Sequence, residues 1–99
     1  MIYTKQILLY LSENKERLFN EFQLEKIGIF GSMARGEQNE NSDVDLIVEF
    51  CQDTPDLFTK KNKLRKEIER KFNVPVDICR EKYIKPYFKN QILAETIYV

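Results

Sequence analysis

The sequence predicts a small α+β domain in which helices flank a mixed β-sheet. Its 99 residues suffice for one modest hydrophobic core, so residues 1–99 are interpreted as a single domain. Segments with helical spacing of apolar residues and segments with two-residue alternation follow one another along the chain. The predicted order is helix, strand, loop, strand, helix, strand and a last helix.

The composition excludes several classes of function. The chain carries 16 Lys and Arg against 16 Asp and Glu, two cysteines and no histidine, which excludes Ser-His-Asp triads, imidazole metal centres and ordinary zinc sites. The apolar run Ile7 to Leu11 is too short for a signal peptide or a membrane span, so we expect a cytoplasmic protein away from membranes. A neutral chain holds a phosphate backbone poorly, and direct nucleic-acid binding is therefore not expected.

The first predicted element is helical. Residues Tyr3 to Phe22 have the apolar spacing of a helix, and the sequence allows a division into two pieces near Ser12 to Asn14. One face of this helix carries the apolar residues Ile7, Leu8, Leu11, Leu18 and Phe22.

Two strands surround a cluster of glycines. Lys26 to Phe30 is predicted as a short strand, and all three glycines of the chain fall within nine positions around its end. The polar run Gln38 to Ser42 is predicted as a loop. In Asp43 to Phe50 apolar residues recur at every second position, which indicates a strand.

The second half of the chain predicts a helix, a strand and a further helix. Thr54 and Pro55 form a suitable N-cap and first turn for a helix that continues to Lys71. Val74 to Ile78 is predicted as a strand, and its proline favours a sheet edge or a strand start. Ile84 to Glu95 is predicted as the last helix, followed by a short extended tail.

Three aspartates are candidate metal ligands. Asp43 and Asp45 are two positions apart on one predicted strand, so both carboxylates project from the same face. From Glu37 to Asp56 there are seven acidic residues and no Lys or Arg, and a bound Mg²⁺ or Mn²⁺ would explain such repelling charges. Asp77 lies on another predicted strand, and pairing of the two strands would add a third carboxylate. The alternative is that all three are ordinary solvent-facing strand residues.

A glycine-serine turn is a candidate phosphate site. Gly31 and Ser32 follow the first predicted strand, where free backbone N–H groups and a hydroxyl suit phosphate oxygens. Arg35 adds a forked cation for the same oxygens. Alone, such a dipeptide usually forms only a loop.

The order and spacing of these elements resemble a known superfamily. Gly31-Ser32, ten intervening residues, Asp43-Val44-Asp45 and, about thirty residues later, Asp77 resemble the DNA polymerase β-like nucleotidyltransferases, and most closely the minimal nucleotidyltransferases. The resemblance covers residues 27–80 in its motifs and implies the palm-like nucleotidyltransferase fold. It implies transfer of AMP from ATP to a hydroxyl, with release of pyrophosphate.

The resemblance also implies roles for the motif residues. Asp43 and Asp45 would bridge two magnesium ions, with manganese as a substitute, and Asp77 would hold the ion on the acceptor side. Gly31 and Ser32 would seat the β- and γ-phosphates. Arg35 would contact a phosphate or a partner.

The resemblance further implies a protein partner. Similar single-domain proteins pair with HEPN-type ribonuclease toxins as antitoxins, in a hetero-oligomer, and some adenylylate a tyrosine of the toxin in a type VII-like toxin-antitoxin pair. Two alternatives stay open: an antitoxin that neutralises its partner by contact alone, and a small-molecule adenylyltransferase. The helix from Lys60 to Lys71, with seven Lys or Arg and two Glu, is either a docking face or a solvated surface.

Overall fold

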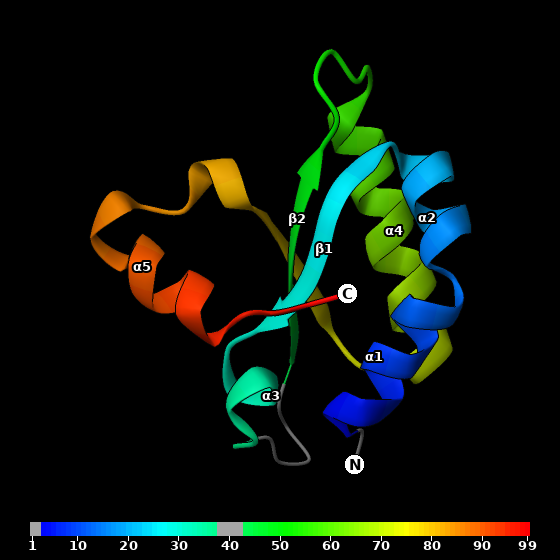
Figure 1. Ribbon diagram of the computed structural model, residues 1–99. Helices are drawn as coiled ribbons and strands as arrows, with labels where there is room; N and C mark the ends of the chain where they lie inside the picture. Colours follow the sequence, from blue (N-terminus) through cyan, green and yellow to red (C-terminus); the bar gives the residue numbers. More distant parts are fainter. Residues whose placement is uncertain (1–2, 38–42) are drawn as a thin grey trace.

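A four-stranded sheet in the order β3-β2-β1-β4 organises the computed structural model, which describes residues 3–37 and 43–99 (Figure 1). The strands are β1 (Leu24–Phe30), β2 (Val44–Phe50), β3 (Val76–Arg80) and β4 (Ile97–Tyr98). The helices are α1 (Thr4–Glu13), α2 (Lys15–Phe22), α3 (Ser32–Arg35), α4 (Leu57–Phe72) and α5 (Pro86–Glu95), with a single 3₁₀ turn η1 (Glu81–Tyr83) before α5.

The strand directions make this a mixed sheet, as the sequence predicts. Strand β1 pairs antiparallel with both β2 and β4. Strand β2 pairs parallel with β3, and α4 provides the long connection that a parallel pair needs. The predicted α+β class with helices around a mixed sheet is therefore confirmed.

The two faces of the sheet are covered differently. Helices α1, α2 and α4 lie together on one face, whereas α5 and η1 extend on the other side (Figure 1). The alternation of β2 explains this asymmetry: Val44, Leu46 and Val48 point into the helix-covered core, and Asp45 and Glu49 point to the opposite face, where they stay half-buried. Charged groups are thus presented on the face that the three large helices leave open.

The N-terminal helical region divides as the sequence predicts. The break falls at Asn14, whose side-chain amide donates a hydrogen bond of 2.9 Å to the carbonyl oxygen of Tyr10. Gln23 adopts a left-handed conformation that ends α2. Strand β1 then begins at Leu24, two residues earlier than predicted, because the Leu24 side chain is buried in the core.

Helix α4 corrects one sequence prediction. It begins at Leu57 rather than at Thr54 and Pro55. The hydroxyl of Thr54 donates to the carbonyl oxygen of Cys51 at 2.6 Å, so it closes the turn after β2 and does not cap helical N–H groups. Asp56, in a left-handed conformation, precedes the helix instead.

The remaining boundaries shift only slightly. Strand β3 starts at Val76, directly after Pro75, and lies at a sheet edge as the proline indicates. Helix α5 begins at Pro86, and the predicted extended tail forms β4. The predicted loop Gln38 to Ser42 lies outside the described residues. Within residues 3–37 and 43–99, no helix combines the length and apolar character needed to cross a bilayer.

Candidate active site

Asp45 and Asp77 lie directly opposite each other on the parallel strands β2 and β3. Each is the second residue of its strand, and both project away from the core, because their neighbours Val44 and Val76 are buried among the helices. Asp45 is half-buried and Asp77 is exposed. Strand pairing therefore brings together these two of the three predicted aspartates.

Asp43 lies just before β2 rather than on it, and its side chain is exposed. Burial raises the pKa of Asp45, and the negative charges of Asp77 and Asp43 raise it further, while Arg35 acts in the opposite direction. The charges of Asp77 and Asp43 therefore both act on the Asp45 carboxylate.

The turn between β1 and α3 brings the backbone against this acidic group. Gly31 has φ 76° and ψ −153°, a conformation that is essentially restricted to glycine. A Cβ atom at Gly31 would lie 2.5 Å from Oδ2 of Asp45. Ser32 begins α3, where the first N–H groups have no partner within the helix. The turn thus places the backbone of Gly31 against Asp45, and Ser32 follows it as the first residue of α3.

Helix α3 is short and is held in place by contacts with the core and with α1. The Met33 side chain is buried in the core, and the hydroxyl of Thr4 on α1 donates a 2.5 Å hydrogen bond to the Met33 carbonyl oxygen. Gly36, with φ 73°, ends the helix in a left-handed conformation. These contacts hold the turn in place although the helix itself has only four residues.

Arg35 is engaged by carboxylates rather than left free for phosphate. Its Nε atom lies 2.9 Å from Glu37 and its Nη1 atom lies 3.1 Å from Glu95 on α5. Hydrogen bonds with Glu37 and Glu95 raise the pKa of the guanidinium. Sequence reasoning did not anticipate the contact with Glu95, which is 60 positions away along the chain.

The chemistry of the acidic group fits a hard divalent cation. Three carboxylates offer the oxygen ligands that Mg²⁺ and Mn²⁺ prefer. Among the described residues, no Lys or Arg forms an ion pair with Asp43, Asp45 or Asp77. In the same part of the chain, no three Asp, Glu or Cys side chains stand close enough together to hold a metal ion. Only the pair Asp45 and Asp77 is brought together by strand register, and the predicted two-ion centre remains a prediction.

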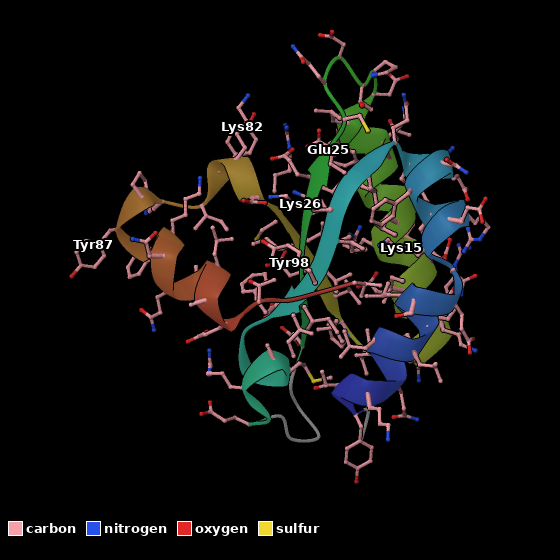
Figure 2. All side chains as sticks on the ribbon, viewed as in Figure 1. Lys15, Glu25, Lys26, Lys82, Tyr87 and Tyr98 are labelled. Atoms are coloured by element: carbon pink, nitrogen blue, oxygen red, sulfur yellow. The ribbon has the colours of Figure 1, made fainter. Side chains whose placement is uncertain are left out.

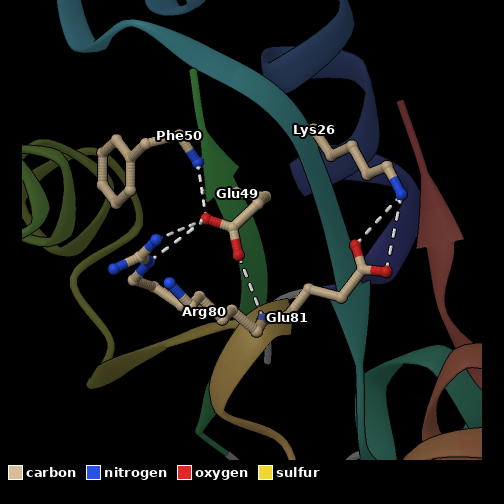
Figure 3. A network of polar contacts seen from close by, with 6 residues as sticks. Lys26, Glu49, Phe50, Arg80 and Glu81 are labelled. Carbon is tan, nitrogen blue, oxygen red and sulfur yellow. Dashed lines mark hydrogen bonds and ion pairs between the residues drawn. The ribbon is translucent and has the colours of Figure 1, made fainter. Parts of the chain in front are cut away.

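A second polar network holds the far end of β2 to β3 and η1 (Figure 3). Glu49 accepts hydrogen bonds from Arg80 at 2.8 and 3.1 Å and from the backbone N–H groups of Phe50 and Lys82 at 2.9 and 3.0 Å. Burial raises the pKa of Glu49, but these hydrogen bonds outweigh it and hold the pKa below its ordinary value. Nearby, Lys26 of β1 pairs with Glu81 of η1 at 3.2 Å.

A pocket of about 380 Å³ adjoins Asp77 on the open side of the sheet. Its walls come from the end of β1, from β3, from η1 and from α5, and Lys61 of α4 also lines it. Sequence reasoning missed this pocket. The available signal was the mixture of basic and aromatic residues from Lys82 to Lys89, whose distance from the motifs hid their place beside Asp77.

A mixed sheet with a glycine-serine turn after its first strand, and with aspartates opposite each other on two parallel strands, has the architecture of a nucleotidyltransferase. The sequence model of the family described as "Nucleotidyltransferase domain" matches residues 8–99. The chain belongs to this family.

Individual relatives agree with this assignment. Protein adenylyltransferase MntA from Thermococcus cleftensis is 33% identical over 99 residues, which cover 100% of this chain and 98% of the relative. A relative from Methanocaldococcus jannaschii, also named as a protein adenylyltransferase, is 37% identical over 90% of each chain. A solved minimal nucleotidyltransferase structure superposes with a TM-score of 0.80 and 28% identity, covering 97% of this chain and 95% of that one.

A more distant solved structure shares the fold alone. It is a toxin-antitoxin complex with AMP-PNP, it has a TM-score of 0.66 and 19% identity, and it covers 87% of this chain and 69% of that chain.

Proposed function

We propose that this protein transfers AMP from ATP to a tyrosine hydroxyl of a HEPN-type toxin and acts as the antitoxin of a type VII-like toxin-antitoxin pair. Three findings support the proposal. The chain belongs to the nucleotidyltransferase family. The relative from Thermococcus cleftensis, which matches it over its whole length, is named a protein adenylyltransferase. The fold also occurs in a solved toxin-antitoxin complex. The partner's type and the tyrosine acceptor come from the family resemblance.

One structural observation carries the proposal. Asp45 lies opposite Asp77 in the strand register and against the backbone of Gly31. A phosphate held at the Gly31-Ser32 turn would therefore lie beside the two carboxylates. Nucleotidyl transfer needs this arrangement, since the triphosphate and the cations that neutralise it must meet at one place.

The residues of the site would have two roles, namely binding of the metal ions and binding of the phosphates. Asp43, Asp45 and Asp77 would hold two Mg²⁺ ions, or Mn²⁺ ions in their place. The ions, when bound, supply neutralisation of the triphosphate charge and a lower pKa of the acceptor hydroxyl. The N–H groups of the Gly31-Ser32 turn and the Ser32 hydroxyl would orient the β- and γ-phosphates.

The transfer needs no reactant besides ATP and the tyrosine. The tyrosine oxygen forms a bond to the α-phosphorus of ATP, and the bond from that phosphorus to the bridging oxygen of the β-phosphate breaks. Pyrophosphate leaves, and the tyrosine proton passes to solvent or to a carboxylate such as Asp77.

The test is to incubate the purified protein with MgCl₂, ATP and the protein encoded beside it, and to measure the intact mass of both chains. We expect one or more adenylyl units on the partner. Asp45→Asn should reduce the transfer by at least about a hundredfold, as loss of a group that stabilises charge in the transition state commonly does. Asp53→Asn is the matched control, because Asp53 is exposed and its left-handed backbone conformation suits asparagine.

The outcomes separate the proposal from its main alternative. If the wild-type protein binds the partner and suppresses its activity without any gain in mass, and Asp45→Asn suppresses it equally well, the protein neutralises by contact and the enzymatic proposal is wrong. Loss of both mass gain and suppression in Asp45→Asn, with Asp53→Asn unaffected, supports catalysis.

A further inference from the structure

The pocket beside Asp77 is built mainly from apolar and aromatic side chains. It lies between β3 and the segment formed by η1 and α5, and it has a volume of about 380 Å³. Its apolar lining comprises Phe30, Ile78, Cys79, Tyr83, Ile84, Phe88 and Ile92. The charged lining comprises Asp77, Lys61, Arg80 and Lys85. Such a pocket suits an aromatic group that carries one polar atom.

Its position relative to the phosphate turn indicates which reactant it receives. The lining includes Asp77 but not Gly31, Ser32 or Asp45. Phe30, which directly precedes Gly31 and lies opposite Asp45 in the strand register, forms one part of the lining, and Asp77 on β3 forms another. In an in-line displacement the attacking oxygen approaches the phosphorus from the side opposite the leaving group. With pyrophosphate at the turn, the attacking side is the side of Asp77.

We propose that this pocket is the acceptor subsite and that it takes the phenol side chain of a tyrosine from the partner protein. The proposal rests on the proposed function, and it adds the place and the chemistry by which the acceptor is selected. The phenol ring would lie among Phe30, Tyr83 and Phe88, with its hydroxyl directed to Asp77.

Exposure of the walls supports an occupant that arrives from outside. Tyr83 is 69% exposed and Phe88 is 47% exposed, so an incoming ring would remove aromatic surface from water. The opposite wall is rigid, because Phe30 ends β1 and Ile78 and Cys79 lie on β3. An exposed aromatic side facing a sheet edge is suited to a side chain that enters and leaves with its protein.

The charges of the lining select against a cationic acceptor. Arg80 is already paired with Glu49 at 2.8 Å, which leaves Lys61 and Lys85 with Asp77 around the pocket. Two ammonium groups favour an oxygen that gains negative charge as its proton leaves. They disfavour a polycationic small molecule. The pocket therefore supports a protein tyrosine over a cationic small-molecule acceptor.

The test uses N-acetyl-tyrosinamide as the acceptor probe and MgATP as the nucleotide. Phe88→Ala removes a pocket wall, whereas Tyr87→Ala removes the neighbouring ring, which is 89% exposed, lies outside the lining and points away from the molecule (Figure 2). The two rings are in contact, with centroids 5.0 Å apart, so the pair is matched in chemistry and place. Both substitutions are on the surface, and both variants should fold.

We expect Phe88→Ala to raise the KM for N-acetyl-tyrosinamide by about five- to tenfold and to leave the Kd of MgATP within about twofold of wild type. Tyr87→Ala should change neither constant. In amide NMR spectra the probe should shift the signals of Tyr83, Ile84 and Phe88.

Contrary results are distinguishable. If Phe88→Ala weakens MgATP binding and leaves the KM for the probe unchanged, the pocket holds the nucleotide base and the proposal is wrong. Equal effects of Phe88→Ala and Tyr87→Ala would overturn it as well. If the wild-type protein modifies no acceptor, the proposed function fails, and the NMR titration decides on the pocket alone: an absence of probe-induced shifts at Tyr83 and Phe88 overturns the subsite too.

Discussion

Gly31 and Asp45 lie so close together that a methyl group on Gly31 would stand 2.5 Å from the Asp45 carboxylate. Two separate constraints therefore require glycine at position 31. Its φ of 76° with ψ of −153° is essentially closed to other residues, and its missing side chain lets the turn rest against the carboxylate. Gly36 provides the contrast, because a Cβ there would meet nothing within 4 Å.

Gly31→Ala should therefore be more harmful than Gly36→Ala. We expect a loss of about 2 to 3 kcal/mol in the free energy of unfolding and loss of MgATP binding for Gly31→Ala, because backbone strain and a steric clash add. Gly36→Ala should lose about 1 kcal/mol from the left-handed conformation alone and should keep nucleotide binding. Urea unfolding and calorimetric titration measure both quantities. Equal effects of the two substitutions would contradict the close contact with Asp45.

Glu49→Gln should destabilise the protein in a pH-dependent way. The folded pKa of Glu49 is lowered from the ordinary 4.5, so its ionised form stabilises the fold above that value, and the contribution is lost as the pH falls through the folded pKa. We expect Glu49→Gln to reduce the free energy of unfolding by about 2 kcal/mol at pH 7, since a charged acceptor of four hydrogen bonds is neutralised. The difference between wild type and variant should shrink below about pH 4.

Glu21→Gln is the matched control for this prediction. Glu21 also pairs with an arginine, at 2.8 Å from Arg17, but the two side chains are 52% and 46% exposed. The exposed pair should contribute no more than about 0.5 kcal/mol. A loss in Glu49→Gln that is as small as this, or that does not change with pH, would show that the Arg80 network adds little to stability.

Residues whose position follows from local pattern could be predicted from the sequence. The alternation of β2 placed Asp45 on the face opposite the core, and the glycines near the end of β1 marked a turn that the structure confirms. The start of α4 was predicted wrongly, because Thr54 has the chemistry of an N-cap but bonds backward to Cys51. The local sequence does not show whether the Thr54 hydroxyl caps a helix or closes the preceding turn.

Contacts between distant segments were not predictable in the same way. Glu95 reaches Arg35, and Tyr83 and Phe88 reach the side of Asp77, only because α5 returns across the open face of the sheet. No spacing rule connects these residues, since their separation in sequence is fixed by the whole path of the chain. The motif positions were therefore predictable, while the pocket beside them was not.

Glu95→Gln should increase the affinity for MgATP if Arg35 contacts a phosphate. In the structure Glu95 holds Nη1 of Arg35 at 3.1 Å, so the nucleotide must compete with a carboxylate. An exposed ion pair is a weak competitor, and we expect the Kd to fall by up to about fivefold. In an Arg35→Ala background, Glu95→Gln should have no further effect on the Kd measured by calorimetry. An unchanged increase in that background would show that Glu95 acts on the nucleotide independently of Arg35.

Gly28→Ala should detach the C-terminal strand from the sheet. A Cβ at Gly28 would lie 2.8 Å from Cγ2 of Thr96 and 2.9 Å from the carbonyl oxygen of Ile97, and the backbone oxygen cannot rotate away as a side chain can. We expect a loss of about 1 to 3 kcal/mol in the free energy of unfolding. The Val99 amide, which donates to the Ile27 carbonyl oxygen at 3.0 Å, should lose its protection from hydrogen exchange.

The displaced strand should also affect the acceptor pocket, because only Thr96 separates α5 from β4 and α5 provides the Phe88 wall. Gly28→Ala should therefore raise the KM for a tyrosine acceptor more than it changes the Kd of MgATP. Thr96→Ser in the same background removes the methyl contact but leaves the Ile97 carbonyl oxygen in place, so it should restore only part of the lost stability. Complete rescue by Thr96→Ser would show that the methyl group of Thr96 and not the backbone limits the approach of the two strands. A Val99 amide that stays protected in Gly28→Ala would show that β4 remains paired and would contradict the prediction.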